Sequence, residues 1–146
     1  MVINMPIFTK AGLPASKILR EEKIQILEEL EGRKILEEGE KLLQIAILNL
    51  MPLKEDTELQ LLRKLSSSGK NIKITFVNVS SYTSKTTAPE HMERFYSTFE
   101  EIKDKYFDGL IITGAPVEQM AFEDVIYWNE LTKIMDWSEA HAKSTL

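Results

Sequence analysis

The chain has no cysteine among its 146 residues. That absence excludes disulfides, cysteine-based metal sites and a thiol nucleophile within this chain. Histidine is almost as scarce, since only His91 and His141 occur and they lie far apart in the sequence. A histidine metal cluster is therefore not expected either.

Excess positive charge and long apolar runs are also missing. The formal net charge is −5 and no basic stripe is present, which argues against a nucleic-acid or membrane-surface partner. No apolar run approaches the length of a membrane span, and the N-terminus lacks the pattern of a signal peptide. What remains is ordinary globular composition, 43% hydrophobic and 28% charged, with enough chain for one domain that has a core.

The most informative apolar run is Ile45–Leu50. It is short and rich in branched residues, which is typical of a strand buried on both faces, and we expect it to be the first strand of a parallel sheet. Pro52 ends the run because it cannot donate to a sheet ladder. The following polar residues predict a helix start with Asp56 or Thr57 as N-cap.

This strand would end at the carboxyl edge of the sheet, where open α/β folds bind ligands. Asn49 is the one polar residue near the end of the run and Lys54 is the first charge after it, and two interpretations stay open. Both side chains point into a crevice, or Asn49 bonds the backbone of the turn while Lys54 is solvated.

The other segments alternate between helix and strand patterns. Residues 1–13 are expected to be irregular, a helix to begin near Ala15, and Ile24–Leu27 to be either part of that helix or a short strand. The acidic segment from Glu28 to Lys41 is expected to be an exposed connector. Further along we expect a helix at 56–65, a strand at 72–79, a polar loop at 80–88, a helix from Pro89 that buries Phe95, Tyr96 and Phe99, a strand at 109–112, helical structure at 122–141 and a strand from Ser144.

This order predicts an α/β fold, a doubly wound parallel sheet with helices on both faces. Residues 1–43 would form an N-terminal extension and connector, and residues 44–146 the N-terminal half of the α/β domain. His91, in the first turn of its helix, is expected to pack or cap and not to catalyse.

A second turn at the carboxyl edge is predicted at Thr113–Pro116. Gly114 would let the backbone approach a ligand closely and point main-chain N–H groups at an anion. Such a turn suits an oxyanion hole, although any strand-to-loop turn can have this sequence.

Several segments, in matching order over nearly the whole chain, closely resemble the homoserine O-acyltransferase family, also called homoserine O-succinyltransferase. They are Ala46–Lys54 (AILNLMPLK), Thr57–Arg63 (TELQLLR), Pro89–His91 (PEH), Phe107–Glu118 (FDGLIITGAPVE) and Tyr127–Trp128, with further similarity at Met5–Ile7 and Leu13–Ala15. The resemblance implies a fold like that of flavodoxin and the class I glutamine amidotransferases. It also implies transfer of an acyl group from acyl-CoA to the homoserine hydroxyl, in methionine biosynthesis, through an acyl-cysteine intermediate.

In that family the nucleophilic cysteine follows the strand that would begin at Ser144, and the catalytic histidine and glutamate come later. The resemblance therefore implies that this chain stops before the nucleophile elbow and has no transferase activity alone.

Three site residues are implied by the resemblance. Lys54 matches a lysine that borders the active site, and Gly114 matches backbone near the oxyanion. Glu118 matches the position associated with acyl choice, where glutamate goes with acetyl-CoA and glycine with succinyl-CoA. A carboxylate there would repel the terminal carboxylate of succinyl, so acetyl transfer is expected.

The segment Gly32–Leu43 departs from the family pattern, because it is acidic and lacks the expected arginine-containing signature. A serine O-acetyltransferase of the same family, in cysteine biosynthesis, therefore stays open as an alternative. A separate alternative is that the 146 residues are a non-catalytic, amidotransferase-like binding module. The resemblance further implies a cytoplasmic homodimer that acts on small molecules, with acetyl-CoA or succinyl-CoA as substrate and no metal or organic cofactor.

Overall fold

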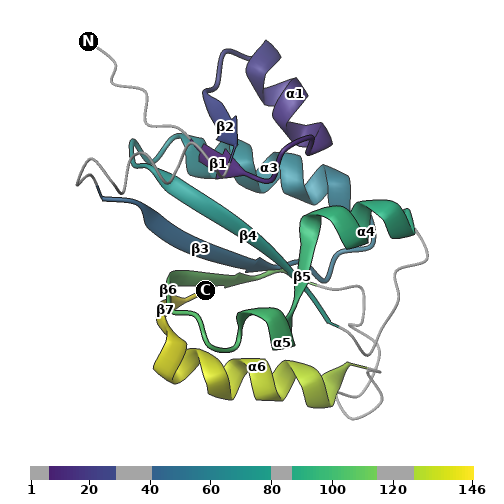
Figure 1. Ribbon diagram of the computed structural model, residues 1–146, viewed down its shortest axis with the longest axis vertical. Helices are drawn as coiled ribbons and strands as arrows, with labels where there is room; N and C mark the ends of the chain where they lie inside the picture. The colour runs from purple at the N-terminus through teal and green to yellow at the C-terminus, as the bar shows by residue number, and fades with distance from the viewer. Residues whose placement is uncertain (1–6, 29–40, 80–86, 115–126) are drawn as a thin grey trace.

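The computed structural model describes residues 7–28, 41–79, 87–114 and 127–146. Within these ranges, seven strands form one sheet in which every pairing is parallel (Figure 1). The strands are β1 (Ile7–Thr9), β2 (Ile26–Glu28), β3 (Leu43–Leu48), β4 (Ile72–Asn78), β5 (Tyr96–Thr98), β6 (Phe107–Ile112) and β7 (Ala142–Thr145). The helices are α1 (Pro14–Glu21), α3 (Lys54–Ser66), α4 (Pro89–Phe95), α5 (Phe99–Ile102) and α6 (Trp128–His141).

The sheet has the order β2-β1-β4-β3-β6-β7, and β5 pairs with the end of β4. β3 is central, since it pairs with β4 along its whole length and with β6 along its second half. Its alternate residues are buried on opposite faces, with Ile47 in one apolar cluster and Ala46 and Leu48 in the other. A strand covered on both faces needs apolar residues at successive positions, which explains the unbroken apolar run.

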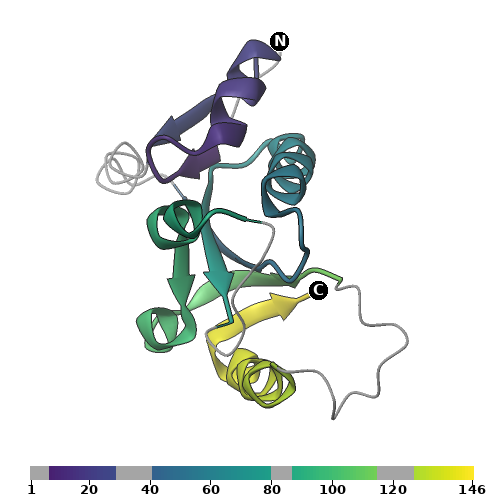
Figure 2. The same ribbon diagram turned by 90° about the vertical axis from the view of Figure 1, so that its right-hand side faces the viewer.

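Helices cover both faces of the sheet. One apolar cluster joins β3 and β4 to α1, α3 and α4, and the other joins them to α5 and α6. In Figure 1, α1, α3 and α4 lie above these strands and α5 and α6 lie below them, and Figure 2 shows the same arrangement from the side. The doubly wound α/β fold that the sequence predicts is confirmed.

The prediction that the apolar run Ile45–Leu50 forms the first strand of the sheet is wrong. β1 lies in the segment predicted to be irregular, and both β1 and β2 precede β3. Each has only three residues, too few to show a periodic pattern, and each is held by pairing with a neighbouring strand. The strand alternative for Ile24–Leu27 is confirmed in part by β2. The boundary at residues 43 and 44 stays a prediction.

The helix predicted from Pro89 does not extend to Phe99. It ends at Phe95, and Tyr96 begins β5. A new helix, α5, starts because Thr98 and Glu101 form a capping box, with side-chain bonds in both directions. Tyr96 is therefore placed at the carboxyl end of β4 and not on a helix face.

The N-cap prediction for α3 is also wrong. The N-cap is Leu53, which makes no side-chain capping bond. Asp56 and Thr57 lie inside the first turn, where Thr57 Oγ1 donates to the Leu53 carbonyl at 3.4 Å. An acidic first turn still favours the positive end of the helix dipole.

The remaining predicted elements agree with the structure where it describes them. α1, β4, β6 and β7 occur at the expected places, and α6 accounts for the later part of the segment 122–141. The connector at 29–40, most of the polar loop and residues 122–126 lie outside the described residues. Among the helices that are described, none has the length and hydrophobicity needed to cross a bilayer.

Candidate functional site

The residues that directly follow β3 and β6 meet at the carboxyl edge of the sheet. The Thr113 N–H donates to the Leu48 carbonyl at 3.1 Å, and the Leu50 N–H donates to Thr113 Oγ1 at 2.7 Å. These bonds continue the pairing of β3 with β6 beyond the strands. The start of the segment that follows β3 and the described start of the segment that follows β6, Thr113 and Gly114, are therefore neighbours.

Gly114 is exposed at this edge, and its φ is not in the left-handed region. A Cβ added there would meet no described atom within 4 Å. Neither backbone strain nor packing against the described residues therefore explains a glycine at this position. Its role near an oxyanion stays a prediction.

Lys54 is the first residue of α3 and is only 5% exposed. Its Nζ donates to the Asn49 carbonyl at 2.6 Å and to the Met51 carbonyl at 3.0 Å. The interpretation that Lys54 is solvated is therefore wrong, because the ammonium folds back into the turn. Burial lowers the pKa of Lys54, and the nearby Glu58 carboxylate raises it in part.

Asn49 is fully buried at the end of β3. Its Oδ1 accepts from the Met51 N–H at 3.1 Å, as expected for a residue that bonds the backbone of the turn. Its Nδ2 also donates to the Tyr96 hydroxyl at 2.9 Å. Asn49 thus joins the turn to β5.

Behind the turn lies a buried network that sequence reasoning missed. Glu58 has no exposed surface. Its carboxylate accepts from the Tyr96 hydroxyl at 2.5 Å, and His91 Nε2 lies 2.9 Å from each of its oxygens. Burial raises the pKa of Glu58, while the bonds from Tyr96 and His91 oppose that rise.

Tyr96 and His91 are fixed by packing as well as by Glu58. Burial raises the pKa of the Tyr96 hydroxyl most, and the negative charge of Glu58 raises it further. The hydroxyl therefore stays protonated and donates. The His91 ring centroid lies 4.8 Å from that of Phe95 and 6.1 Å from that of Tyr96. His91 thus packs against both rings while it pairs with Glu58, and its Nδ1 also lies 3.6 Å from the exposed Glu55 carboxylate. The expectation that it does not catalyse stays a prediction.

Helix spacing was the signal that could have revealed Glu58. Positions 54, 58 and 62 lie four residues apart and share one helix face. All three are buried in α3, and Leu62 belongs to the apolar cluster. A glutamate on a leucine-rich face needs buried partners.

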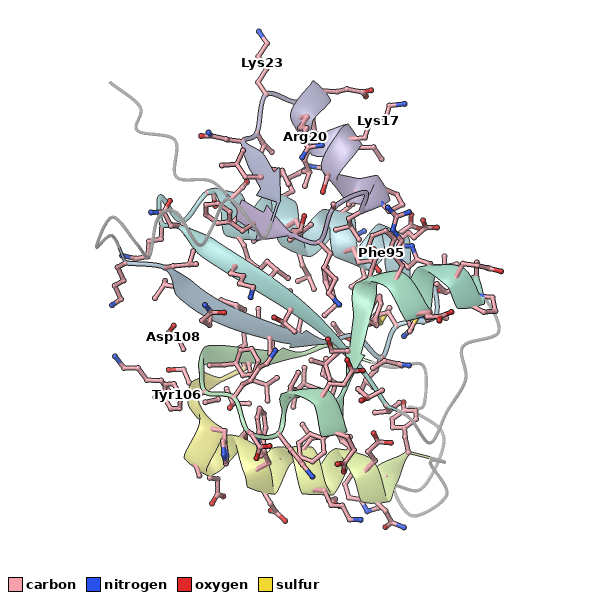
Figure 3. The ribbon with its side chains drawn as sticks, in the orientation of Figure 1. Lys17, Arg20, Lys23, Phe95, Tyr106 and Asp108 are labelled. Carbon is pink, nitrogen blue, oxygen red and sulfur yellow. The ribbon has the colours of Figure 1, made fainter. Side chains whose placement is uncertain are left out.

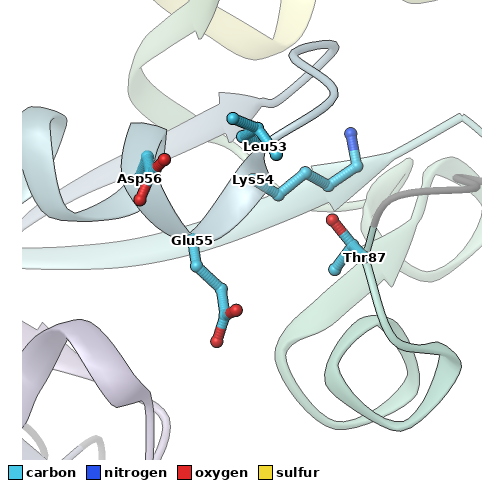
Figure 4. Close-up of a pocket in the computed structure, with 5 residues that line it drawn as sticks. All are labelled: Leu53, Lys54, Glu55, Asp56 and Thr87. Atoms are coloured by element: carbon cyan, nitrogen blue, oxygen red, sulfur yellow. The ribbon is translucent and has the colours of Figure 1, made fainter.

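A small open pocket lies beside the turn, lined by Leu53, Lys54, Glu55, Asp56 and Thr87 (Figure 4). Its volume of about 70 Å³ is far below the roughly 300 to 1,000 Å³ of a typical ligand site. Lys54 extends toward Thr87 in this view, whereas Glu55 points away. The pocket could therefore hold only part of a substrate.

Glu118 lies outside the described residues, so its position relative to Lys54 is not shown. No group of three potential metal ligands occurs among the residues that are described. Lys54 thus places an ammonium at the described edge, and the carboxylate, imidazole and phenol of Glu58, His91 and Tyr96 are buried behind it.

The fold and this edge define a class of protein: a flavodoxin-like α/β domain with a polar site at the carboxyl ends of its central strands. A family model described as homoserine O-succinyltransferase matches residues 6–146. The chain therefore belongs to the homoserine O-succinyltransferase family, as the sequence resemblance predicts.

Similar proteins support the same assignment. A homoserine O-acetyltransferase of Lachnoclostridium phytofermentans is 56% identical over 97% of this chain and 46% of its own length. Proteins of the same name from Agathobacter rectalis and Streptococcus thermophilus are 50% and 51% identical over 97% of this chain, and over 45% and 44% of their own lengths. The chain spans about half the length of the curated relatives it matches.

Proposed function

We propose that the protein containing this chain is an acyl-CoA-dependent homoserine O-acetyltransferase of methionine biosynthesis. The observation that carries the proposal is the 56% identity, over 97% of this chain, to a protein named homoserine O-acetyltransferase. The donor is acetyl-CoA and not succinyl-CoA, since all three relatives described above are named for acetyl transfer.

The reaction proceeds in two acyl transfers. A cysteine thiolate attacks the thioester carbonyl of acetyl-CoA, forms an acyl-cysteine and releases the CoA thiolate. The homoserine hydroxyl, deprotonated by a histidine base, then attacks the acyl-cysteine, which yields the O-acetyl ester and frees the thiol. Because this chain has no cysteine, the nucleophile comes from sequence outside it.

This chain supplies electrostatic groups to the reaction. Lys54 is buried next to the β3 turn, where a cation would stabilise the negative charge that develops on the carbonyl oxygen or bind a carboxylate. Backbone at Gly114 would contribute N–H donors to the same oxygen. Glu118 would repel the terminal carboxylate of a succinyl group and so favour acetyl.

The wider setting follows from the family. The protein works in the cytoplasm as a homodimer, on small-molecule substrates, with no metal or organic cofactor. The 146-residue chain alone is inactive because the thiol and its histidine base are not part of it.

An assay of the full-length protein tests the function. Purified protein is given acetyl-CoA or succinyl-CoA with homoserine or serine, and CoA release is measured. The highest kcat/KM is expected for acetyl-CoA with homoserine. A preference for serine would replace the proposal with serine O-acetylation, and no turnover with any pair would favour a binding module.

A further inference from the structure

Glu58 connects three parts of the chain that are distant in sequence. It lies on α3, its hydrogen-bond partner His91 lies on α4, and its partner Tyr96 begins β5. Each of these side chains is less than one-tenth exposed. Among the residues described, every buried side-chain nitrogen or oxygen has at least one hydrogen-bond partner.

The Glu58 carboxylate sets the direction of the hydrogen bonds that follow it. An ionised carboxylate only accepts, so the Tyr96 hydroxyl must donate to it, which leaves the hydroxyl oxygen free to accept. That oxygen accepts from Asn49 Nδ2. The amide of Asn49 is thereby oriented with Oδ1 toward the Met51 N–H.

The turn after β3, with Asn49 oriented in this way, holds the Lys54 ammonium. Lys54 Nζ donates to the Asn49 and Met51 carbonyls, and Asn49 Nδ2 lies 3.4 Å from the Lys54 carbonyl. An ammonium has three N–H donors, so the two described carbonyls leave one for a substrate. The direction of that N–H depends on where the two carbonyls lie.

Packing alone does not require this arrangement. Glu58 shares its buried helix face with Leu62, a member of the apolar cluster, and an apolar side chain would fill the same space without the cost of burying a charge. The carboxylate is the member that an apolar residue could not replace, because it fixes which groups donate and which accept.

We propose that Glu58, acting through Tyr96 and Asn49, is a positioning residue that aims the Lys54 ammonium at the reacting acyl group. The inference rests on the acyl transfer proposed above. His91 Nε2 holds the same carboxylate, at 2.9 Å from each of its oxygens.

The first test removes one atom from the network in the full-length protein. Tyr96→Phe keeps the ring that packs on Phe76 but deletes the hydroxyl between Glu58 and Asn49. We expect kcat for acetyl transfer to fall by about tenfold or more, with KM for homoserine little changed. Tyr106→Phe is the matched control, since Tyr106 is 57% exposed and lies at the other end of the sheet from Phe95 (Figure 3).

The second test does not depend on activity. Acetic anhydride, in trace amounts, acetylates neutral lysine amines, and mass spectrometry follows the labelling of Lys54 against pH in the full-length protein. Glu58→Gln removes the negative charge that raises the pKa of Lys54, so the labelling profile is expected to move to lower pH. Glu100→Gln, at an exposed site, is the control and should leave the profile in place.

The outcomes separate the inference from the proposed function. A fall in kcat for Tyr96→Phe together with a moved Lys54 profile for Glu58→Gln supports the positioning role. An unchanged kcat, or an unchanged profile, overturns it. If the wild-type protein has no transferase activity, the proposed function fails, and the labelling profile alone decides whether the network holds Lys54. If Glu58→Gln does not fold, the profile is measured on Tyr96→Phe, where an unmoved profile overturns the proposal.

Discussion

The two faces of the sheet bury different kinds of side chain. Toward α5 and α6, the buried cluster is built from residues such as Leu48, Val77, Leu110 and Ile134. Toward α3 and α4, a similar apolar cluster continues into the network of Glu58, His91 and Tyr96. Buried lysine, glutamate and histidine occur, among the described residues, only on this second side.

The apolar side of the sheet stabilises the fold, whereas the polar side holds the groups that can take part in chemistry. Apolar burial stabilises a fold without direction, whereas each buried ionisable group costs free energy unless it is paired. The paired groups lie next to the β3 turn, at the edge where parallel sheets bind ligands. Substitutions on the polar side should therefore alter the reaction, and substitutions on the apolar side should alter unfolding.

The largest effect is expected for Lys54→Ala in the full-length protein. Loss of a charged donor to a developing oxyanion typically lowers kcat by about 10² to 10³. Steady-state kinetics and a denaturant titration of the same sample measure both quantities. Kinetics equal to wild type would remove Lys54 from the site, and a loss explained wholly by unfolding would make it structural.

Leu110→Ala should lower the free energy of unfolding and leave kcat nearly unchanged. Leu110 is 2% exposed in β6, within the apolar cluster, and removing a buried leucine side chain costs about 2 to 5 kcal/mol of unfolding free energy. Chemical denaturation of the full-length variant measures the loss. Its kcat per folded molecule should stay near the wild-type value. A loss of kcat per folded molecule would contradict the claim that the apolar face affects stability and not the reaction.

Glu118→Gly should change the choice of donor more than the rate. Without the carboxylate, succinyl is no longer repelled, so the ratio of kcat/KM for succinyl-CoA to that for acetyl-CoA should rise, by about tenfold for one relieved charge contact. Competition between the two donors measures the ratio. An unchanged ratio would show that Glu118 does not line the acyl pocket.

The smallest effect is expected in the pH dependence of stability. Burial raises the pKa of Glu58 above its ordinary value of 4.5, so the folded state binds more protons than the unfolded state between 4.5 and the raised pKa. The contribution of Glu58 to the free energy of unfolding therefore falls as pH rises through that window. The denaturation midpoints of wild type and Glu58→Gln are compared from acid to neutral pH. As the pH rises, the wild-type midpoint should fall relative to that of the variant. A constant difference would mean that the Glu58 pKa is the same in both states.

The parts of the structure that the sequence predicts are those encoded locally. The apolar run that became β3 is visible without any partner, because burial on two faces leaves a short pattern of successive apolar residues. β1 and β2 were missed or left ambiguous because three residues carry no periodicity.

The network was missed because its contacts are not local. His91 and Tyr96 lie 33 and 38 residues beyond Glu58, and Tyr96 was expected to lie on a helix. Only the sheet pairing of β5 with β4 brings its hydroxyl to the turn. The strand-end pattern and the resemblance both predict Lys54 as a site residue, and the structure adds the groups that hold it.

A double-mutant cycle of Lys54→Ala and Tyr96→Phe, read as kcat/KM for acetyl transfer to homoserine by the full-length protein, tests the link between the two residues most directly. If Tyr96 acts through Lys54, removing its hydroxyl should cost little once the ammonium is gone, so the two effects should be strongly non-additive. Additive losses would contradict the positioning network and leave Tyr96 with a role independent of Lys54.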